Sequence, residues 1–187
     1  MKKLFILIFL VTIFTSLSAQ TKGSNTDTEE AEDDTTVLFM SEHVKVVFPA
    51  RPEMQTLPTG GTLYLLNKDA QTTYTAMGID LGSIGLTADF VKSEGNKLWE
   101  QLKEAIFSQL TGVSITKDQT RIFKGRNSLY IELDGINSED VQFKGKKAYT
   151  LLFFEGRILN QFMYLSSSKN SKPEDANVFF NSIIIEN

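Results

Sequence analysis

Two long apolar runs near the C-terminus constrain the fold more than any other part of the sequence. Residues 148–154 and 158–165 are separated by Glu155-Gly156-Arg157. Glycine supplies the positive φ that a tight hairpin turn requires, so the pattern predicts a β-hairpin. Neither run alternates between apolar and polar residues, which indicates strands that are covered on both faces. We therefore expect this hairpin at the centre of a sheet.

A short helix and a final strand are predicted after the hairpin. Residues 172–175 place a proline in the first helical turn and two acids at the positive end of the helix dipole. Ala176, Phe179 and Phe180 then fall on one helix face, which we expect to cover the sheet. The β-branched run 183–185 predicts a last strand that returns to the sheet.

The preceding sequence predicts further antiparallel strands and one long helix. Thr87 and Asp89 provide a cap and a negative charge for a helix with an apolar period that ends at Gly112. Pro49 and Pro52 keep their segment extended and out of a central strand ladder, so we expect it to cross an edge of the sheet. Strands are predicted at 36–40, 44–48, 62–66, 72–81, 113–123 and 127–133.

The N-terminal part of the chain has a different composition from the rest. Lys2 and Lys3, an apolar run and a small-residue stretch that ends at Ala19 match a secretory signal peptide, with cleavage predicted after Ala19. An uncleaved membrane anchor is the alternative. Residues 20–35 have no large apolar side chain and carry six acids, so they bury too little surface to order.

This composition predicts three segments. We expect a signal peptide at 1–19, a disordered acidic linker at 20–35 and one domain at 36–187. The predicted location is therefore exported, either in the periplasm or outside the cell, with no membrane span after signal cleavage.

Composition also argues against several classes of function. The chain has no cysteine, which excludes disulfides, thiolate catalysis and cysteine-ligated metals. From residue 36 onward 17 acids face 16 bases, so the domain has no electrostatic preference for nucleic acid. We predict no nucleic-acid partner.

Few residues suggest catalytic chemistry. His43 is the only histidine, and no serine lies in a GxSxG elbow. Glu132 and Asp134 fall on one face of a predicted strand and could act as paired carboxylates, but acids at a strand end are more often solvated. We predict a protein that is not an enzyme and that uses no cofactor or metal.

The aromatic residues include four candidates for a binding surface. Most phenylalanines are assigned to the core, because they fall on predicted strands or helix faces. Tyrosine combines an apolar ring with a polar tip, which suits the rim of a binding surface. The candidate ligand or partner residues are Tyr64, Tyr74, Tyr130 and Tyr164.

Three short motifs resemble those of the PsbP-like family. They are VVFPARP at 46–52, FFEGR at 153–157 and ANVFFNSI at 176–183, and together they bracket most of 37–186. Ile183 stands where an aromatic residue is commoner. The resemblance implies an α+β fold, a single antiparallel β-sheet with helices packed on its faces as an α/β/α sandwich. It also implies a binding or assembly role, and it transfers no functional residue.

Two functions remain open on the sequence. The first is an exported, non-catalytic binding or assembly module of the bacterial cell envelope, with an unknown protein partner. The alternative is a carrier of a small apolar or amphiphilic ligand between sheet and helix. A well-packed interface with an exposed apolar patch would favour the module, whereas an enclosed cavity of several hundred cubic ångström would favour the carrier. We predict the module.

Overall fold

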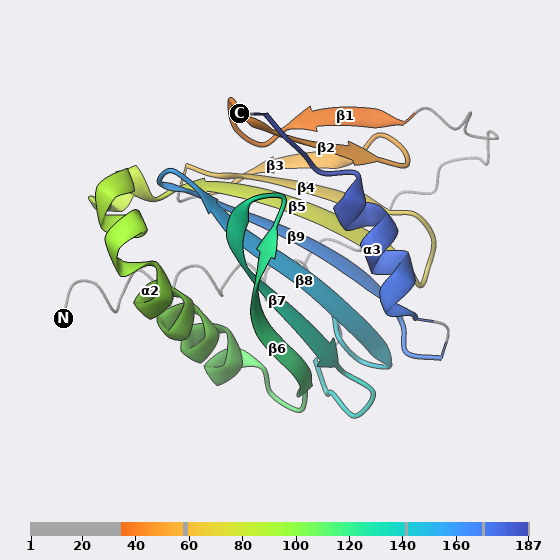
Figure 1. The fold of residues 1–187 in the computed structure, drawn as a ribbon. Coiled ribbons are helices and arrows are strands. Elements are labelled where there is room, and N and C mark those ends of the chain that lie inside the picture. The colour runs from red at the N-terminus through yellow and green to blue at the C-terminus, as the bar shows by residue number, and fades with distance from the viewer. Residues whose placement is uncertain (1–34, 58–59, 141, 170, 187) are drawn as a thin grey trace.

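The computed structural model of the chain describes residues 35–57, 60–140, 142–169 and 171–186. The predicted signal peptide and residues 20–34 of the predicted linker lie outside this range. Within it, strands form two sheets, and helices lie on both faces of the larger one (Figure 1). Among the described residues, no helix is long and apolar enough to cross a membrane.

The larger sheet has seven strands and is antiparallel throughout, in the order β3-β4-β5-β9-β8-β7-β6. The predicted central hairpin is confirmed, because β8 and β9 occupy the middle of this order. Gly156 turns between them with a φ of 57°. The strands are β3 (Glu53–Thr56), β4 (Thr62–Asn67), β5 (Thr73–Asp80), β6 (Ser114–Phe123), β7 (Arg126–Asp134), β8 (Lys146–Glu155) and β9 (Ile158–Ser167).

The smaller sheet corrects the expectation of a single sheet. It has the order β1-β2-β10, and its strands are β1 (Thr36–Phe39), β2 (Val44–Phe48) and β10 (Ile184–Ile185). Pro49 and Pro52 interrupt the ladder after β2, so the chain leaves this sheet before it enters the larger one at the edge strand β3. The last strand pairs Ile184 with Lys45 of β2 and does not join the large sheet.

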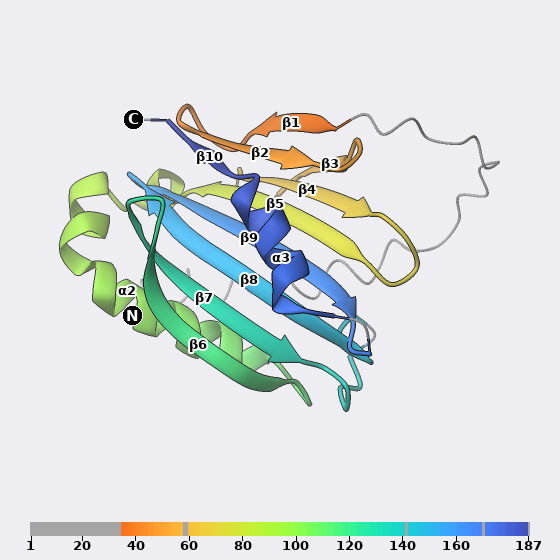
Figure 2. The same cartoon turned by 45° about the vertical axis from the view of Figure 1, so that its right-hand side comes forward.

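Two helices cover the large sheet from opposite sides. Helix α2 (Ala88–Gln109) begins where the Thr87 side chain accepts a hydrogen bond from the Phe90 amide, as predicted, and follows a short 3-10 helix, η2 (Leu81–Ile84). Helix α3 (Pro173–Asn181) is also confirmed, and it buries the three predicted residues. Figure 2 shows α3 and the small sheet on the same side of the large sheet.

Each face of the large sheet has its own apolar core. The α2 core is mainly aliphatic, and its buried members include Leu98, Trp99, Leu102, Ile106, Leu129 and Leu152. The α3 core is mainly aromatic, and its buried members include Phe48, Tyr130, Phe153, Phe162, Phe179 and Phe180. The alternation of side chains along each strand separates the two cores, so that Phe153 and Phe154 belong to different faces.

Candidate functional site

All five tyrosines of the chain lie on the face of the large sheet that α3 and the small sheet cover. Three of them form a row across adjacent strands, because Tyr74 lies opposite Tyr164, and Tyr164 lies opposite Tyr149. The ring centroids are 5.3 Å and 6.2 Å apart along this row. Such cross-strand aromatic pairs stabilise a sheet.

The four tyrosines that the sequence singled out differ in exposure. Tyr130 and Tyr164 are only 2% and 5% exposed, so their rings belong to the core, whereas Tyr64 and Tyr74 are half-buried at its border. A ligand or partner surface at these residues stays a prediction. Tyr149 was missed, and only the strand register reveals its place in the row, because β8 is buried on both faces and shows no alternation.

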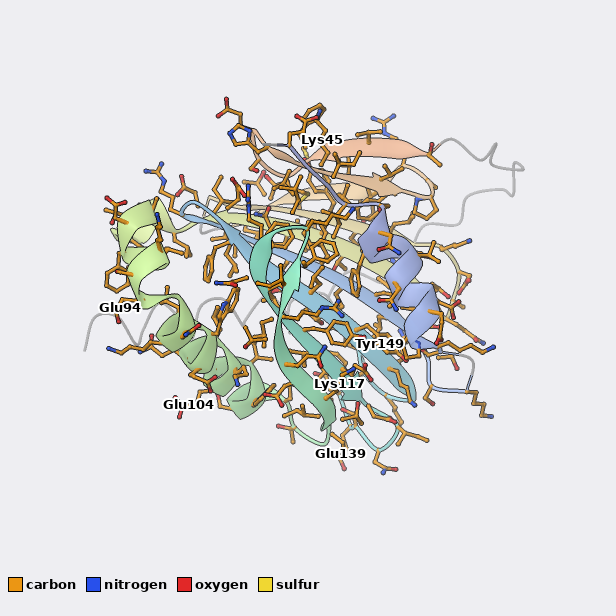
Figure 3. The ribbon with its side chains drawn as sticks, in the orientation of Figure 1. Lys45, Glu94, Glu104, Lys117, Glu139 and Tyr149 are labelled. Carbon is orange, nitrogen blue, oxygen red and sulfur yellow. The ribbon has the colours of Figure 1, made fainter. Side chains whose placement is uncertain are left out.

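Strand β6 places two cations over Tyr130. The Arg121 guanidinium carbon lies 4.2 Å from the centroid of the Tyr130 ring, and the Lys117 Nζ lies 5.5 Å from it. Figure 3 shows Lys117 and Tyr149 on the side of the sheet that faces α3. Burial raises the pKa of the Tyr130 hydroxyl, and the nearby Glu132 raises that pKa further. The hydroxyl is therefore neutral at physiological pH and is not poised to act as a base.

The predicted catalytic candidates do not form a shared centre. The Glu132 Oε1 lies 3.8 Å from the Lys117 Nζ, and the Asp134 Oδ2 lies 3.7 Å from the Lys147 Nζ, so each carboxylate has a lysine of its own. His43 is exposed in the turn between β1 and β2. Within the described part of the chain, no group of three or more histidine and acidic side chains could hold a metal ion.

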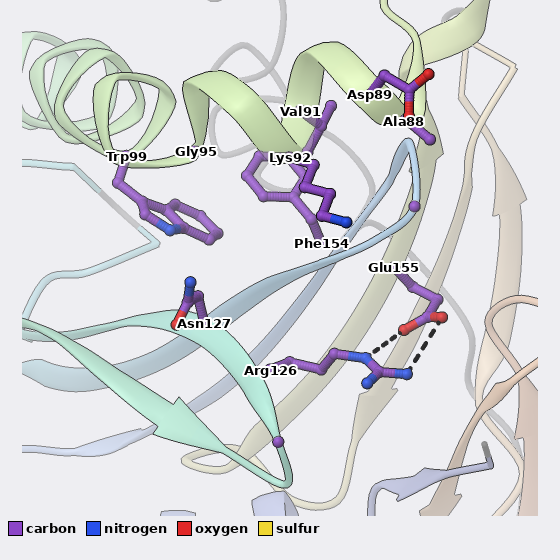
Figure 4. A pocket seen from close by; sticks show the side chains of 12 residues that line it. Ala88, Asp89, Val91, Lys92, Gly95, Trp99, Arg126, Asn127, Phe154 and Glu155 are labelled. Carbon is purple, nitrogen blue, oxygen red and sulfur yellow. Dashed lines mark hydrogen bonds and ion pairs between the residues drawn. The ribbon is translucent and has the colours of Figure 1, made fainter.

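A groove lies between the N-terminal half of α2 and the tips of the β6–β7 and β8–β9 hairpins (Figure 4). Its volume is about 640 Å³, and it opens to solvent. The sequence did not indicate this site, because it arises from the position of a helix against two turns. The α2 groove is lined by Ala88, Asp89, Val91, Lys92, Gly95, Trp99, Gly125, Arg126, Asn127, Phe154, Glu155 and Gly156.

The rim of the α2 groove carries one two-pronged ion pair. The Arg126 Nε donates to the Glu155 Oε2 at 2.7 Å, and the Nη2 donates to the Oε1 at 3.4 Å. Lys92 makes no ion pair with any described residue, and Figure 4 shows its side chain extending from α2 toward the strands. Among the charged residues that line the groove, Lys92 is therefore the cation without an ion pair, and Asp89 is the carboxylate without one.

A second surface lies on the outer face of the small sheet, which we define by Val37, Phe39, Lys45 and Ile184. Val37, Phe39 and Ile184 are 51%, 63% and 44% exposed. Lys45 lies opposite Phe39 on one side and opposite Ile184 on the other. Its ammonium group lies 5.0 Å from the centroid of the Phe39 ring and pairs with Glu186. Two exposed apolar side chains therefore flank an aliphatic lysine stem.

Comparison with known proteins bears on the fold. No protein-family model and no curated protein sequence matches the chain. A solved structure of cyanobacterial PsbP (CyanoP) from Synechocystis sp. PCC 6803 matches with a TM-score of 0.53 and 8% identity, over 88% of this chain and 98% of that chain. The chain has a PsbP-like fold. The resemblance drawn from the three motifs is thus confirmed for the fold.

A second structure, a protein of unknown function from Pseudomonas aeruginosa, matches with a TM-score of 0.44 and 9% identity, over 79% of this chain and 92% of that chain. At such identities the likeness concerns the fold alone. The PsbP-like fold of this chain is α+β, with a three-stranded sheet beside the seven-stranded one.

Proposed function

We propose that the protein is an exported, non-catalytic binding module of the bacterial cell envelope and that a protein partner binds the outer face of its small sheet. Export rests on the predicted signal peptide at 1–19. Binding without catalysis fits the site residues, because Glu132 and Asp134 are each paired with a separate lysine. Burial raises the pKa of Tyr74, Tyr130 and Tyr164, so their hydroxyls are harder to ionise than that of an ordinary tyrosine.

The observation that carries this proposal is the exposure of Val37, Phe39 and Ile184 around Lys45. Phe39 and Ile184 flank Lys45 in one cross-strand row, so the aliphatic stem of Lys45 joins their apolar surfaces. Contiguous apolar surface on a soluble domain commonly marks an interaction site. β1 is also an edge strand of the small sheet, and an edge strand can pair with an additional strand from a partner.

Site-specific photo-crosslinking in the intact cell envelope tests the proposal. We expect benzoylphenylalanine at position 39 to form an adduct with one distinct protein. The same residue at position 104 should form none, because Glu104 is exposed on the outer side of α2 (Figure 3). Adding Ile184→Lys to the position-39 protein should abolish the adduct. Equal adducts at both positions, or none at position 39, would contradict a partner on this face.

Export has its own test. Protein recovered from the envelope fraction is expected to begin at Gln20 on N-terminal sequencing, as predicted from the cleavage site after Ala19. Protein found only in the cytoplasm with residues 1–19 intact would contradict export.

A further inference from the structure

The α2 groove has a size suited to a small molecule, and the half-buried Phe154 ring forms its floor above the buried Trp99. The ring centroids of Trp99 and Phe154 lie 4.6 Å apart with an interplanar angle of 34°, and Val91 adds an aliphatic wall. A volume of about 640 Å³ falls within the range of small-molecule pockets, roughly 300–1,000 Å³. The walls belong to one helix and two hairpins, so the shape is largely preformed.

Gly95 keeps the middle of this groove open. It lies in the interior of α2, where glycine is less stable than alanine by about 0.5–1 kcal/mol. Its φ is not positive, and a Cβ added at this position would find no heavy atom within 4 Å beyond its chain neighbours and the helix backbone. Neither backbone conformation nor packing therefore requires glycine here, whereas a branched side chain such as leucine would extend into the groove.

The charged lining of the groove is balanced, and Lys92 is the group in it that can attract an anion. The Glu155 carboxylate already accepts two hydrogen bonds from Arg126, which neutralises that arginine. The Lys92 ammonium has no ion-pair partner among the described residues, and the exposed Asn127 adds amide donors. Figure 4 shows the Lys92 side chain directed toward the strands and the Asp89 carboxylate directed away from them.

We infer that the α2 groove binds a small amphiphilic anion, with its flat apolar part against the half-buried Phe154 ring and its acidic group at Lys92. The inference goes beyond the proposed partner surface and does not depend on it. The groove belongs to the α2 face of the large sheet, whereas β2 of the small sheet packs on the opposite face. An experiment that contradicts ligand binding in the groove would therefore leave the proposed partner surface untouched, and the reverse also holds.

The single tryptophan of the chain makes the test direct, because the buried Trp99 ring lies 4.6 Å from the Phe154 ring at the floor of the groove. The probe is 1-anilinonaphthalene-8-sulfonate, a flat apolar anion, titrated into the protein that begins at Gln20 while Trp99 emission is followed. We expect saturable quenching of Trp99 with one probe per chain. N-phenyl-1-naphthylamine lacks the sulfonate. We expect its dissociation constant to be at least about threefold higher, which is the size expected for one exposed charge contact.

Matched variants locate the binding in the groove. Gly95→Leu should weaken binding of the sulfonate probe by about tenfold or more, since loss of the apolar contact corresponds to at least one tenfold step in affinity. Gly95→Ala should leave the affinity close to that of the wild type. Both variants favour the helix, so a folding defect is not expected, and circular dichroism checks this.

The charge is tested in the same way. Lys92→Gln should weaken the sulfonate probe by about threefold and leave the neutral probe unchanged. Lys97→Gln is the control, because Lys97 lies on α2 outside the groove and pairs with Glu94. Undiminished quenching in Gly95→Leu, no Trp99 response at saturating probe, or equal binding of the two probes would overturn the inference.

Discussion

The two faces of the seven-stranded sheet are covered in different ways. On the α3 face the rings of Phe153 and Phe162 stack with centroids 5.7 Å apart, and Phe179 meets Phe48 edge-on at 5.3 Å. Both a helix and the small sheet close this face. On the other face α2 packs on a mainly aliphatic core, and a groove remains beside its N-terminal half.

The dimensions of helices and strands explain this difference. Seven strands about 4.8 Å apart make a sheet roughly 30 Å wide, whereas a helix with its side chains is about 10–12 Å wide. One helix therefore cannot cover such a face by itself, but a helix and a three-stranded sheet cover much more of it. The uneven cover leaves the groove of about 640 Å³ at the hairpin tips on the α2 face and only a smaller cavity, of about 200 Å³, between the small sheet and α3 on the other face.

The substitution with the largest expected effect removes an aromatic ring from the core on the α3 face. Phe162 is fully buried and contacts the rings of Phe153 and Phe179. Phe162→Ala should lower the free energy of unfolding by about 3–5 kcal/mol, because the lost ring leaves a cavity that its rigid neighbours cannot fill. Urea unfolding followed by circular dichroism measures this. A loss below about 1 kcal/mol would show that the face is loosely packed.

The matching change on the other face should have a smaller effect. Leu102 of α2 is 3% exposed. Leu102→Ala is expected to lower the free energy of unfolding by about 2–3 kcal/mol, at the lower end for leucine, because the helix can move toward the sheet. The same urea experiment applies. A loss larger than that of Phe162→Ala would reverse the comparison between the two faces.

Loss of the α2 cap should have a still smaller effect. The Thr87 hydroxyl accepts a hydrogen bond from the Phe90 amide at 3.2 Å. Thr87→Ala should lower the free energy of unfolding by about 1 kcal/mol, because an amide at the helix start loses its partner. Ser93→Ala is the control, since the Ser93 hydroxyl only donates to a carbonyl within the helix. Equal losses in the two variants would argue against a role for the cap.

The smallest expected effect depends on pH. Hydrogen bonds from Arg157, and then from the Gly82 amide, lower the pKa of Asp80. A lowered pKa stabilises the fold at neutral pH, and this contribution is lost as the pH falls through the lowered pKa. The pair is well exposed, so its contribution should stay below about 1 kcal/mol.

Urea unfolding across the acid range tests the Asp80 contribution. The stability of Asp80→Asn should fall less steeply on acidification than that of the wild type, because the variant has no carboxylate to protonate. Parallel pH profiles for the two proteins would contradict the role of this ion pair.

Several elements could be predicted because their signals are local. The central hairpin follows from two apolar runs around Gly156, and the buried face of α3 follows from helical spacing. A glycine inside a strand commonly marks a bulge or a close approach. Gly78 of β5 marks a close approach, because a Cβ there would lie 3.0 Å from the Met40 carbonyl oxygen.

The features that could not be predicted depend on distant contacts. The local sequence pattern of β10 does not determine whether this strand pairs with β2, as Ile184 does with Lys45, or joins the large sheet. β3 has no strand signal, since its one large apolar residue, Met54, is exposed on an edge strand. The α2 groove likewise depends on where the helix crosses the hairpin tips, so no motif marks it.

One measurement tests the contrast between the closed and the open face most directly. The chain has no cysteine, so a single introduced thiol reports on one position. Gly95 borders the groove, whereas Ser128 is fully buried on the α3 face. The thiol of Gly95→Cys should react with a bulky maleimide nearly as fast in the folded as in the unfolded protein, and that of Ser128→Cys only after global unfolding. Equal rates for the two folded variants would contradict the account.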